Sequence, residues 1–280
     1  MKPATKSVLR AVRASPVGRM LNVPRRAFNA LPVAGKPLVR MAIWTFTSRE
    51  DTNYTYPLTD LNIRYLAHAV AAVTGAGYEE AAGYIRELQQ DRELAAHVTR
   101  LSSTGEDRTI SDNRADFAKR LGWYAVARIL KPEVIVETGV DKGLGTVVLA
   151  AAVLRNGRGR VYGTDINPKA GRLLAGKYAA AGEVLYGDSI ATLKAFPHGI
   201  DLFINDSDHS ADYEAREYET IVSKLTDRAI VMADNAHATD KLATWSERNG
   251  RKFLFWGEAP QNHWYPGGGI GFSYGSAPRV

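Results

Sequence analysis

The sequence predicts a doubly wound α/β fold, with helices on both faces of a mostly parallel sheet. From Val134 onward, short segments rich in β-branched residues alternate with helical ones, as is typical of such sheets. The first of these strands runs directly into a glycine-rich loop. The last two strands lack a helix between them, so they can pair only as antiparallel neighbours.

The elements follow in a regular order. Apolar residues recur every three or four positions between Leu61 and Leu101 and again over 114–130, which predicts helices, the latter with Asp112 or Asn113 as its N-cap. Seven strands are expected, at 134–140, 160–166, 183–187, 201–206, 228–235, 252–257 and 269–275. The helices expected between them cover 146–155, 170–181, 190–196, 213–225 and 241–249.

Three regions follow from this order: a basic arm over 1–50, a helical cap over 51–111 and the α/β domain over 112–280. The chain has no cysteine, which excludes disulfides, thiolate metal sites and a cysteine nucleophile. A cysteine-free chain suits a reducing compartment, so we expect a cytoplasmic protein. Such a protein could also contact a membrane at its periphery.

Positive charge is concentrated at the N-terminus. Ten of the 36 Lys and Arg residues, and none of the 30 Asp and Glu residues, lie within 1–49, so the rest of the chain has a net charge of −4. A nucleic-acid-binding protein would carry its basic surface on the folded body, so we expect no nucleic-acid partner.

The arm mixes Arg with Leu, Val, Met and Phe and has no apolar run long enough to span a bilayer. Three interpretations stay open at this point. The arm could lie on an anionic membrane surface, could pack on a neighbouring subunit or lack fixed structure, or could resemble a mitochondrial presequence.

The loop after the first strand contains Glu137, Gly139, Asp141, Gly143 and Gly145, spaced GxxxGxG. In doubly wound folds ligands bind beside this loop. A dinucleotide site would show GxGxxG, and two carboxylates beside a pyrophosphate would repel it. Glu137 and Asp141 instead favour a cationic ligand, so we exclude a nicotinamide cofactor.

The next two strands also end in acidic residues. Asp165 ends the second strand, where a carboxylate can accept hydrogen bonds from ribose hydroxyls, although it also suits a turn before Asn167-Pro168. Asp188 and Ser189 follow the third strand, where Asp188 could bind an adenine amino group, cap a helix, or do both.

In this order, these motifs resemble the class I S-adenosylmethionine (SAM)-dependent methyltransferases over roughly residues 112–276. The resemblance implies that SAM is the cationic ligand. It also implies a seven-stranded sheet of order 3-2-1-4-5-7-6, with strand 7 antiparallel. Enzymes of this kind are often dimers or larger, so a homo-oligomer is expected.

A second group of polar residues follows the fourth and fifth strands. Asp206, Asp208 and His209 come after the fourth strand, and Asp234 and Asn235 end the fifth. Asp206, Asp234 and Asn235 could together bind Mg²⁺ or a similar hard cation. His209 is then placed to remove a proton from a hydroxyl as general base, because a cation lowers the pKa of an oxygen bound to it.

This region is similar to the metal-dependent O-methyltransferases. Asp206-Ser207-Asp208-His209 matches the D-x-D-H motif of the macrocin-like sugar enzymes, in which the His is the base, whereas Asp234-Asn235 matches the catechol and caffeoyl-CoA enzymes. The resemblance implies methyl transfer to a hydroxyl of a saccharide or other small natural product. Asp208 is assigned to orienting His209 or holding the acceptor.

Two other functions are compatible with the sequence. The protein could be a SAM methyltransferase that needs no metal, or a non-catalytic protein of SAM-binding fold that acts at a membrane through its arm. Residues 261–269, rich in Gly and aromatic side chains, could form an acceptor lid or a surface hairpin.

Overall fold

The computed structural model describes residues 14–51, 54–112 and 114–275. The chain divides into two units. Unit 1 comprises residues 1–48 together with Asn262–Tyr265, and unit 2 comprises the remainder. Unit 1 contains helices α2 (Pro16–Leu21) and α3 (Val23–Thr47). Among the described residues, every helix is too short or too polar to traverse a bilayer.

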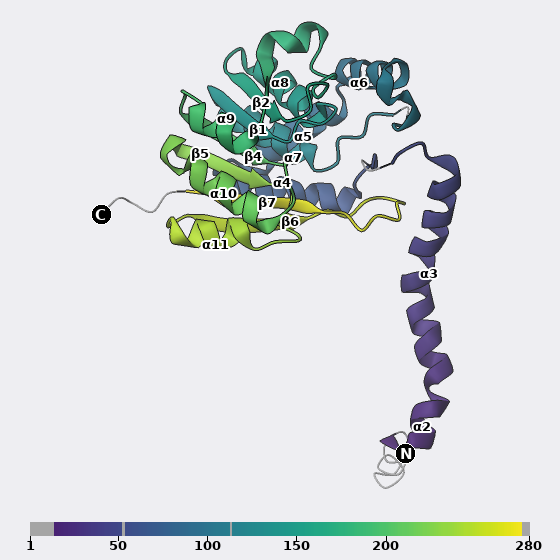
Figure 1. Cartoon of the computed structure of the whole chain (residues 1–280). Coiled ribbons are helices and arrows are strands. Elements are labelled where there is room, and N and C mark those ends of the chain that lie inside the picture. Colours follow the sequence, from purple (N-terminus) through teal and green to yellow (C-terminus); the bar gives the residue numbers. More distant parts are fainter. Residues whose placement is uncertain (1–13, 52–53, 113, 276–280) are drawn as a thin grey trace. The chain divides into compact units, whose positions relative to one another are not determined.

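Unit 2 is built around one seven-stranded sheet (Figure 1). Its order is β3-β2-β1-β4-β5-β7-β6, and only β7 runs antiparallel to its neighbours, which confirms the predicted fold class and order. The strands are β1 (Val134–Thr138), β2 (Arg160–Asp165), β3 (Gly182–Tyr186), β4 (Ile200–Asn205), β5 (Leu225–Ala233), β6 (Lys252–Gly257) and β7 (Gly269–Tyr274).

Helices cover both faces of the sheet. On one face α8 (Leu144–Asn156) packs against β1 and β2, and α7 (Arg120–Leu130) packs against α8. On the other face lie α9 (Ser189–Ala195), α10 (Ala211–Ile221) and α11 (Lys241–Arg248). The central strands are therefore covered on both sides, and all but one residue of β1 and all but one residue of β4 are buried.

The predicted N-terminal helical extension is present in unit 2. It consists of α4 (Asp60–Thr74), α5 (Tyr78–Gln89) and α6 (Arg92–Thr104), followed by the 3₁₀ turn η1 (Glu106–Thr109). Helix α4 starts at Thr59, whose hydroxyl caps Asn62 N–H, and ends at Gly75 in the left-handed conformation. The helices α4 and α5 pack against α7 and so extend the layer that covers the sheet.

Two local expectations are wrong. The helix expected over 170–181 is instead a run of turns that ends in η2 (Gly176–Ala181), because Gly171 and Gly176 adopt positive φ angles and interrupt it. The helix expected from residue 114 begins only at Arg120, with Lys119 at its N-cap position. Asp112 instead accepts a hydrogen bond from Arg49 N–H, and Asn113 lies outside the described residues.

The late start of α7 has a physical cause. The backbone N–H of Lys119 donates to the buried carboxylate of Glu258 (2.9 Å), and Ala118 takes a positive φ of 45°. Tyr56 donates to the same carboxylate (2.9 Å). Glu258 thus ties the chain entering α7 to the end of β6, and this long-range contact brings the Lys119 side chain to the carboxyl edge of the sheet.

Candidate functional site

A cavity of about 620 Å³ opens at the carboxyl ends of the central strands, within unit 2. This is where ligands bind in doubly wound folds. Of the predicted site residues, the following line the cavity: Glu137, Gly139, Asp141, Asp165, Asp188, Ser189, Asp206, Asp208 and His209. Three other predicted residues, Gly143, Asp234 and Asn235, are not part of this lining.

The glycine loop lets two strand ends meet. Gly139 has a φ of +79°, and a Cβ on it would lie 1.9 Å from the backbone oxygen of Asp206. Gly145 has a similar restriction, since its Cβ would lie 1.9 Å from Glu137 Oε1. Gly143 adopts a φ of +95° and begins α8. The backbone of the loop therefore favours glycine at 139 and 143, whereas the side chains of Glu137 and Trp123 leave no room for a Cβ at 145.

Glu137 is the deepest acid in the cavity. It is 1% exposed, and its Oε2 accepts a hydrogen bond from the Thr146 hydroxyl (2.5 Å). Burial raises the pKa of Glu137 to about 8, with the nearby Asp206 carboxylate adding to the rise and the Thr146 bond and Arg120 opposing it. A cation bound beside Glu137 would favour its ionised form.

Asp165 connects the two loops beside β1 and β2. Its Oδ2 accepts from Asp141 N–H (2.8 Å) and its Oδ1 accepts from Asn167 N–H (2.8 Å). The turn role considered from the sequence is therefore present. The carboxylate also lines the cavity, where its remaining lone pairs can accept hydrogen bonds from hydroxyl groups such as those of a ribose.

Asp188 caps α9 and also faces the cavity. Its Oδ1 accepts from Ala191 N–H (2.8 Å), and its Oδ2 accepts from the Tyr213 hydroxyl (2.7 Å). The Tyr213 hydrogen bond is the largest cause that lowers the pKa of Asp188, so the carboxylate is held in its charged form. Tyr213, which lines the cavity from α10, was not predicted from the sequence.

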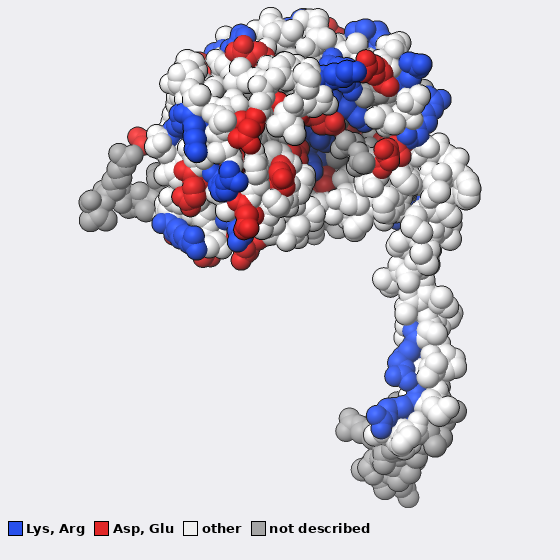
Figure 2. Space-filling view, viewed as in Figure 1, with Lys and Arg blue, Asp and Glu red and all other residues white. Residues whose placement is uncertain are grey.

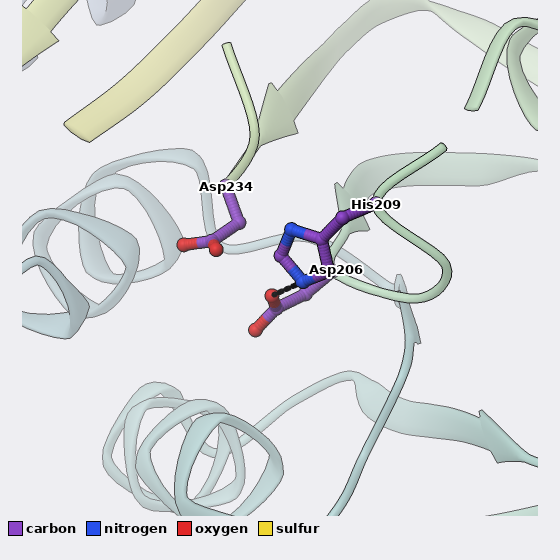
Figure 3. A group of neighbouring side chains, drawn as sticks. All are labelled: Asp206, His209 and Asp234. Atoms are coloured by element: carbon purple, nitrogen blue, oxygen red, sulfur yellow. Dashed lines mark ion pairs between the residues drawn. The ribbon is translucent and has the colours of Figure 1, made fainter. Parts of the chain in front are cut away.

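Hydrogen bonds beyond the ends of the strands bring the acidic residues together. Asp206 N–H donates to Thr138 O (3.0 Å), and Asp234 N–H donates to Asn205 O (2.9 Å), so β1, β4 and β5 are held side by side past their last paired residues. Asp206 and Asp234 consequently point toward a common space beside His209 (Figure 3).

Asp206, His209 and Asp234 form a group in which each side chain offers an atom within 4.8 Å of the others. His209 Nε2 lies 3.9 Å from Asp206 Oδ1. The His209 side chain is half exposed, whereas the carboxylates of Asp206 and Asp234 are largely buried. Burial raises the pKa of Asp206, opposed by the nearby charges of Lys119, Arg120 and His209. Two buried carboxylates and an imidazole are a suitable donor set for a divalent cation.

Two predicted residues act mainly on the loop between β4 and α10. The Asn235 amide donates to His209 O (3.0 Å), so it fixes the backbone that carries the imidazole. Asp208 is exposed, and its Oδ1 accepts from Ser210 N–H (2.7 Å), which is also the largest cause that lowers its pKa. Among the described residues, Asp208 forms no hydrogen bond with the His209 ring.

Lys119 was not predicted from the sequence, yet its ammonium forms an ion pair with Asp234. Both side chains are largely buried, and burial lowers the pKa of Lys119. The neighbouring Arg120 lines the cavity. In the sequence, Lys119 is marked only as half of a basic pair, Lys119-Arg120, that precedes a mostly apolar helical segment.

Glu217 forms hydrogen bonds with several residues that carry the site. This buried carboxylate of α10 accepts hydrogen bonds from Thr138 (3.0 Å) and Ser207 (2.8 Å), and also from Ser189 and Asn205. It therefore joins the ends of β1 and β4 to the start of α9. Burial raises its pKa, which those donors oppose.

The aromatic loop expected as a lid lies partly in unit 1. Trp264 packs against Trp44 of α3 with ring centroids 5.2 Å apart, and Asn262 Oδ1 accepts from Arg40 (3.1 Å). In the described structure, the residues that line the cavity include none from 261–269. The lid role stays a prediction.

Residues 136–236, from β1 to the loop after β5, match the family model of a methyltransferase domain. No curated protein matches the chain significantly. A candidate caffeoyl-CoA O-methyltransferase from Staphylococcus aureus has a similar structure, with 15% identity and a TM-score of 0.50 over 78% of this chain and 100% of that one.

Two further crystal structures are similar at lower scores. One is a methyltransferase from Geobacter sulfurreducens, with 22% identity and a TM-score of 0.49 over 64% of this chain and 89% of that one. The other is the O-methyltransferase TomG from Streptomyces achromogenes in complex with SAM, with 14% identity and a TM-score of 0.48 over 67% of this chain and 91% of that one. Together with the domain match over residues 136–236, the observed sheet order shows that unit 2 has the fold of the class I SAM-dependent methyltransferases.

Proposed function

We propose that the protein transfers the methyl group of SAM to a hydroxyl of a saccharide or another small natural product, assisted by Mg²⁺ or a similar cation. The observation that carries this proposal is the convergence of Asp206, His209 and Asp234 at two adjacent strand ends. The cavity that adjoins them is also lined by the acidic residues expected to bind SAM.

Charge favours SAM in this cavity. Glu137 and Asp165 lie at the carboxyl ends of β1 and β2, and Asp141 lies on the loop after β1. SAM carries a cationic ammonium and a cationic sulfonium. In a partly enclosed site such opposite charges attract more strongly than in water. Asp165 and Asp188 are proposed to bind the ribose and adenine groups.

The residues present fit a divalent cation. Asp206 and Asp234 supply oxygen donors beside the His209 imidazole. The side-chain oxygen of Asn235, the residue after Asp234, is a third candidate ligand, which leaves the His209 nitrogen free to act as base. When bound, a cation of this kind lowers the pKa of an acceptor hydroxyl that contacts it. The Lys119 ammonium pairs with Asp234 Oδ1, so an ion that contacts this carboxylate would lie beside that positive charge.

His209 is proposed as the general base. Its ring is half exposed and lines the cavity, so it can accept the proton of an acceptor hydroxyl placed there. Asp206, 3.9 Å from Nε2, would stabilise the imidazolium that results. The same imidazole is a possible cation ligand, and a residue that ligates through this nitrogen cannot also accept the proton there.

One observation favours a second candidate function, methyl transfer without a metal. Lys119 already provides a positive charge at Asp234, where the ion would bind. In this version the ammonium of Lys119 neutralises the acidic site, and His209 alone removes the proton.

The two versions are separated by a transfer assay with isotope-labelled SAM and a panel of glycosides and phenols. Loss of transfer in EDTA and its return with Mg²⁺ would support the metal version, and unchanged transfer in EDTA would support the other. Calorimetry with SAM tests what they share. Both versions predict that the wild-type chain binds SAM and that Asp165→Ala binds it more weakly. If the wild-type chain does not bind SAM, both versions are wrong.

A further inference from the structure

We propose that α3 is an interfacial helix that lies on an anionic phospholipid surface. The proposal rests on unit 1 alone and is independent of the methyl acceptor. Helix α3 has 25 residues, and none of them is buried. Several of its large apolar side chains are mostly exposed, among them Phe28 at 75%, Val33 at 77% and Phe46 at 88%.

The exposed side chains separate into two sides of the helix. At 3.6 residues per turn, the four basic residues fall within a sector of about 100°. They are Arg25, Arg26, Lys36 and Arg40. Most large apolar residues fall within about 160° on the opposite side. They are Val23, Phe28, Leu31, Leu38, Val39, Met41 and Phe46, whereas Val33 and Ile43 fall within the basic sector.

The charge of the arm selects an anionic partner. Residues 1–49 contain ten basic residues and no acidic one. In Figure 2 the charged atoms visible on the described arm are accordingly all blue. Another copy of α3 would bring like charges together, because neither helix offers a carboxylate to the other's Arg residues. A nucleic acid would satisfy the basic side but leave the apolar side in water.

A phospholipid surface satisfies both sides of the helix. The apolar side chains enter the boundary between headgroups and acyl chains, while the Arg and Lys side chains contact the headgroup phosphates. Helices that bind in this way lie in the plane of the membrane. The absence of a membrane-crossing segment among the described helices agrees with that orientation.

Co-sedimentation of the full chain with lipid vesicles tests the proposal. We expect binding to vesicles of phosphatidylcholine mixed with phosphatidylglycerol, little binding to phosphatidylcholine alone, and weaker binding as salt increases. The double variant Arg25→Glu/Arg26→Glu should lose binding by about tenfold or more, as should Phe28→Glu/Leu31→Glu. A matched control, Lys194→Glu/Lys252→Glu, makes the same charge change at exposed sites of unit 2 and should bind like the wild type.

Several outcomes would overturn the proposal. These are no sedimentation with anionic vesicles, equal binding to both vesicle types, or an equal loss of binding in the Lys194/Lys252 control. Light scattering could also reveal an oligomer that the arm variants dissociate while vesicles bind nothing, which would make α3 a subunit contact. SAM affinity, measured on each variant, verifies that unit 2 is folded and does not depend on the lipid result.

Discussion

The ammonium of Lys119 contacts the carboxylate of Asp234 at the end of β5, and both side chains are largely buried. Asp234 is also one of the three residues that could hold a cation. The site therefore has a built-in positive charge at the position where a metal ion would bind, and the two compete for one carboxylate.

Replacement of Lys119 tests this competition. Lys119→Met leaves Asp234 buried without its partner, which should lower stability in EDTA by about 3–5 kcal/mol. If the cation binds here, Mg²⁺ should raise the melting temperature of the variant more than that of the wild type. Thermal unfolding with and without Mg²⁺ measures both effects. An equal rise in melting temperature in the two proteins would show that Lys119 does not compete with a cation.

Replacement of His209 tests the proposed base. His209→Ala should reduce turnover by about 10²-fold or more, the usual effect of losing a general base, while SAM affinity is retained. Asp208→Asn on the same loop is the comparison, and we expect a smaller loss of turnover because that side chain is exposed and bonds Ser210 N–H. A larger loss in the Asp208 variant than in the His209 variant would exchange their proposed roles.

The pH dependence of SAM binding tests Glu137. The pKa of this residue is raised to about 8 by burial, so it is mostly protonated at neutral pH in the free protein. A cationic ligand binds the ionised form more tightly, so SAM affinity should rise with pH up to about 8 and then level off. Glu137→Gln should remove this dependence, as measured by calorimetry across pH. The same slope in the variant would show that another group is responsible.

The same pKa affects stability. The folded-state pKa of Glu137 is higher than the ordinary value of 4.5, so the folded state holds this proton more tightly than the unfolded state does. The resulting contribution to the free energy of unfolding is fully present below pH 4.5 and is lost as pH rises through about 8. Glu137→Gln should therefore flatten the decrease in stability over this interval, as measured by urea unfolding at a series of pH values. A decrease of equal slope in both proteins would contradict the assignment.

Gly139 provides a test of the loop geometry. Gly139→Ala forces a left-handed residue and a contact with Asp206 O, so we expect a loss of about 2 kcal/mol or more together with weaker SAM binding. Gly83→Ala is the control, because a Cβ there meets nothing within 4 Å inside α5 and should stabilise the protein by about 0.5–1 kcal/mol. Similar effects from both substitutions would show that Gly139 is not required.

The fold was predictable because strand and helix patterns depend on local sequence. The alternation after Val134 gave the elements, and the resemblance gave the strand order. The errors arose at glycines and at tertiary contacts. Gly171 and Gly176 break an otherwise helical pattern, and the start of α7 depends on a hydrogen bond between Lys119 and Glu258, which are far apart in sequence.

The site was predictable to a similar degree. Acidic residues at the ends of parallel strands meet for topological reasons, so Asp206 and Asp234 could be paired from sequence. No comparable rule says which residues of a covering helix will reach the ends of the strands. Lys119 and Tyr213 enter the site through the packing of α7 and α10, and no spacing in the sequence marks them.

The most direct test is a crystal grown with S-adenosylhomocysteine and Mn²⁺ in place of Mg²⁺, with the metal located by anomalous scattering. The proposal predicts the nucleoside beside Glu137 and Asp165, and one metal peak in contact with Asp206 and Asp234. A nucleoside outside the cavity, or a metal peak remote from both carboxylates, would contradict it.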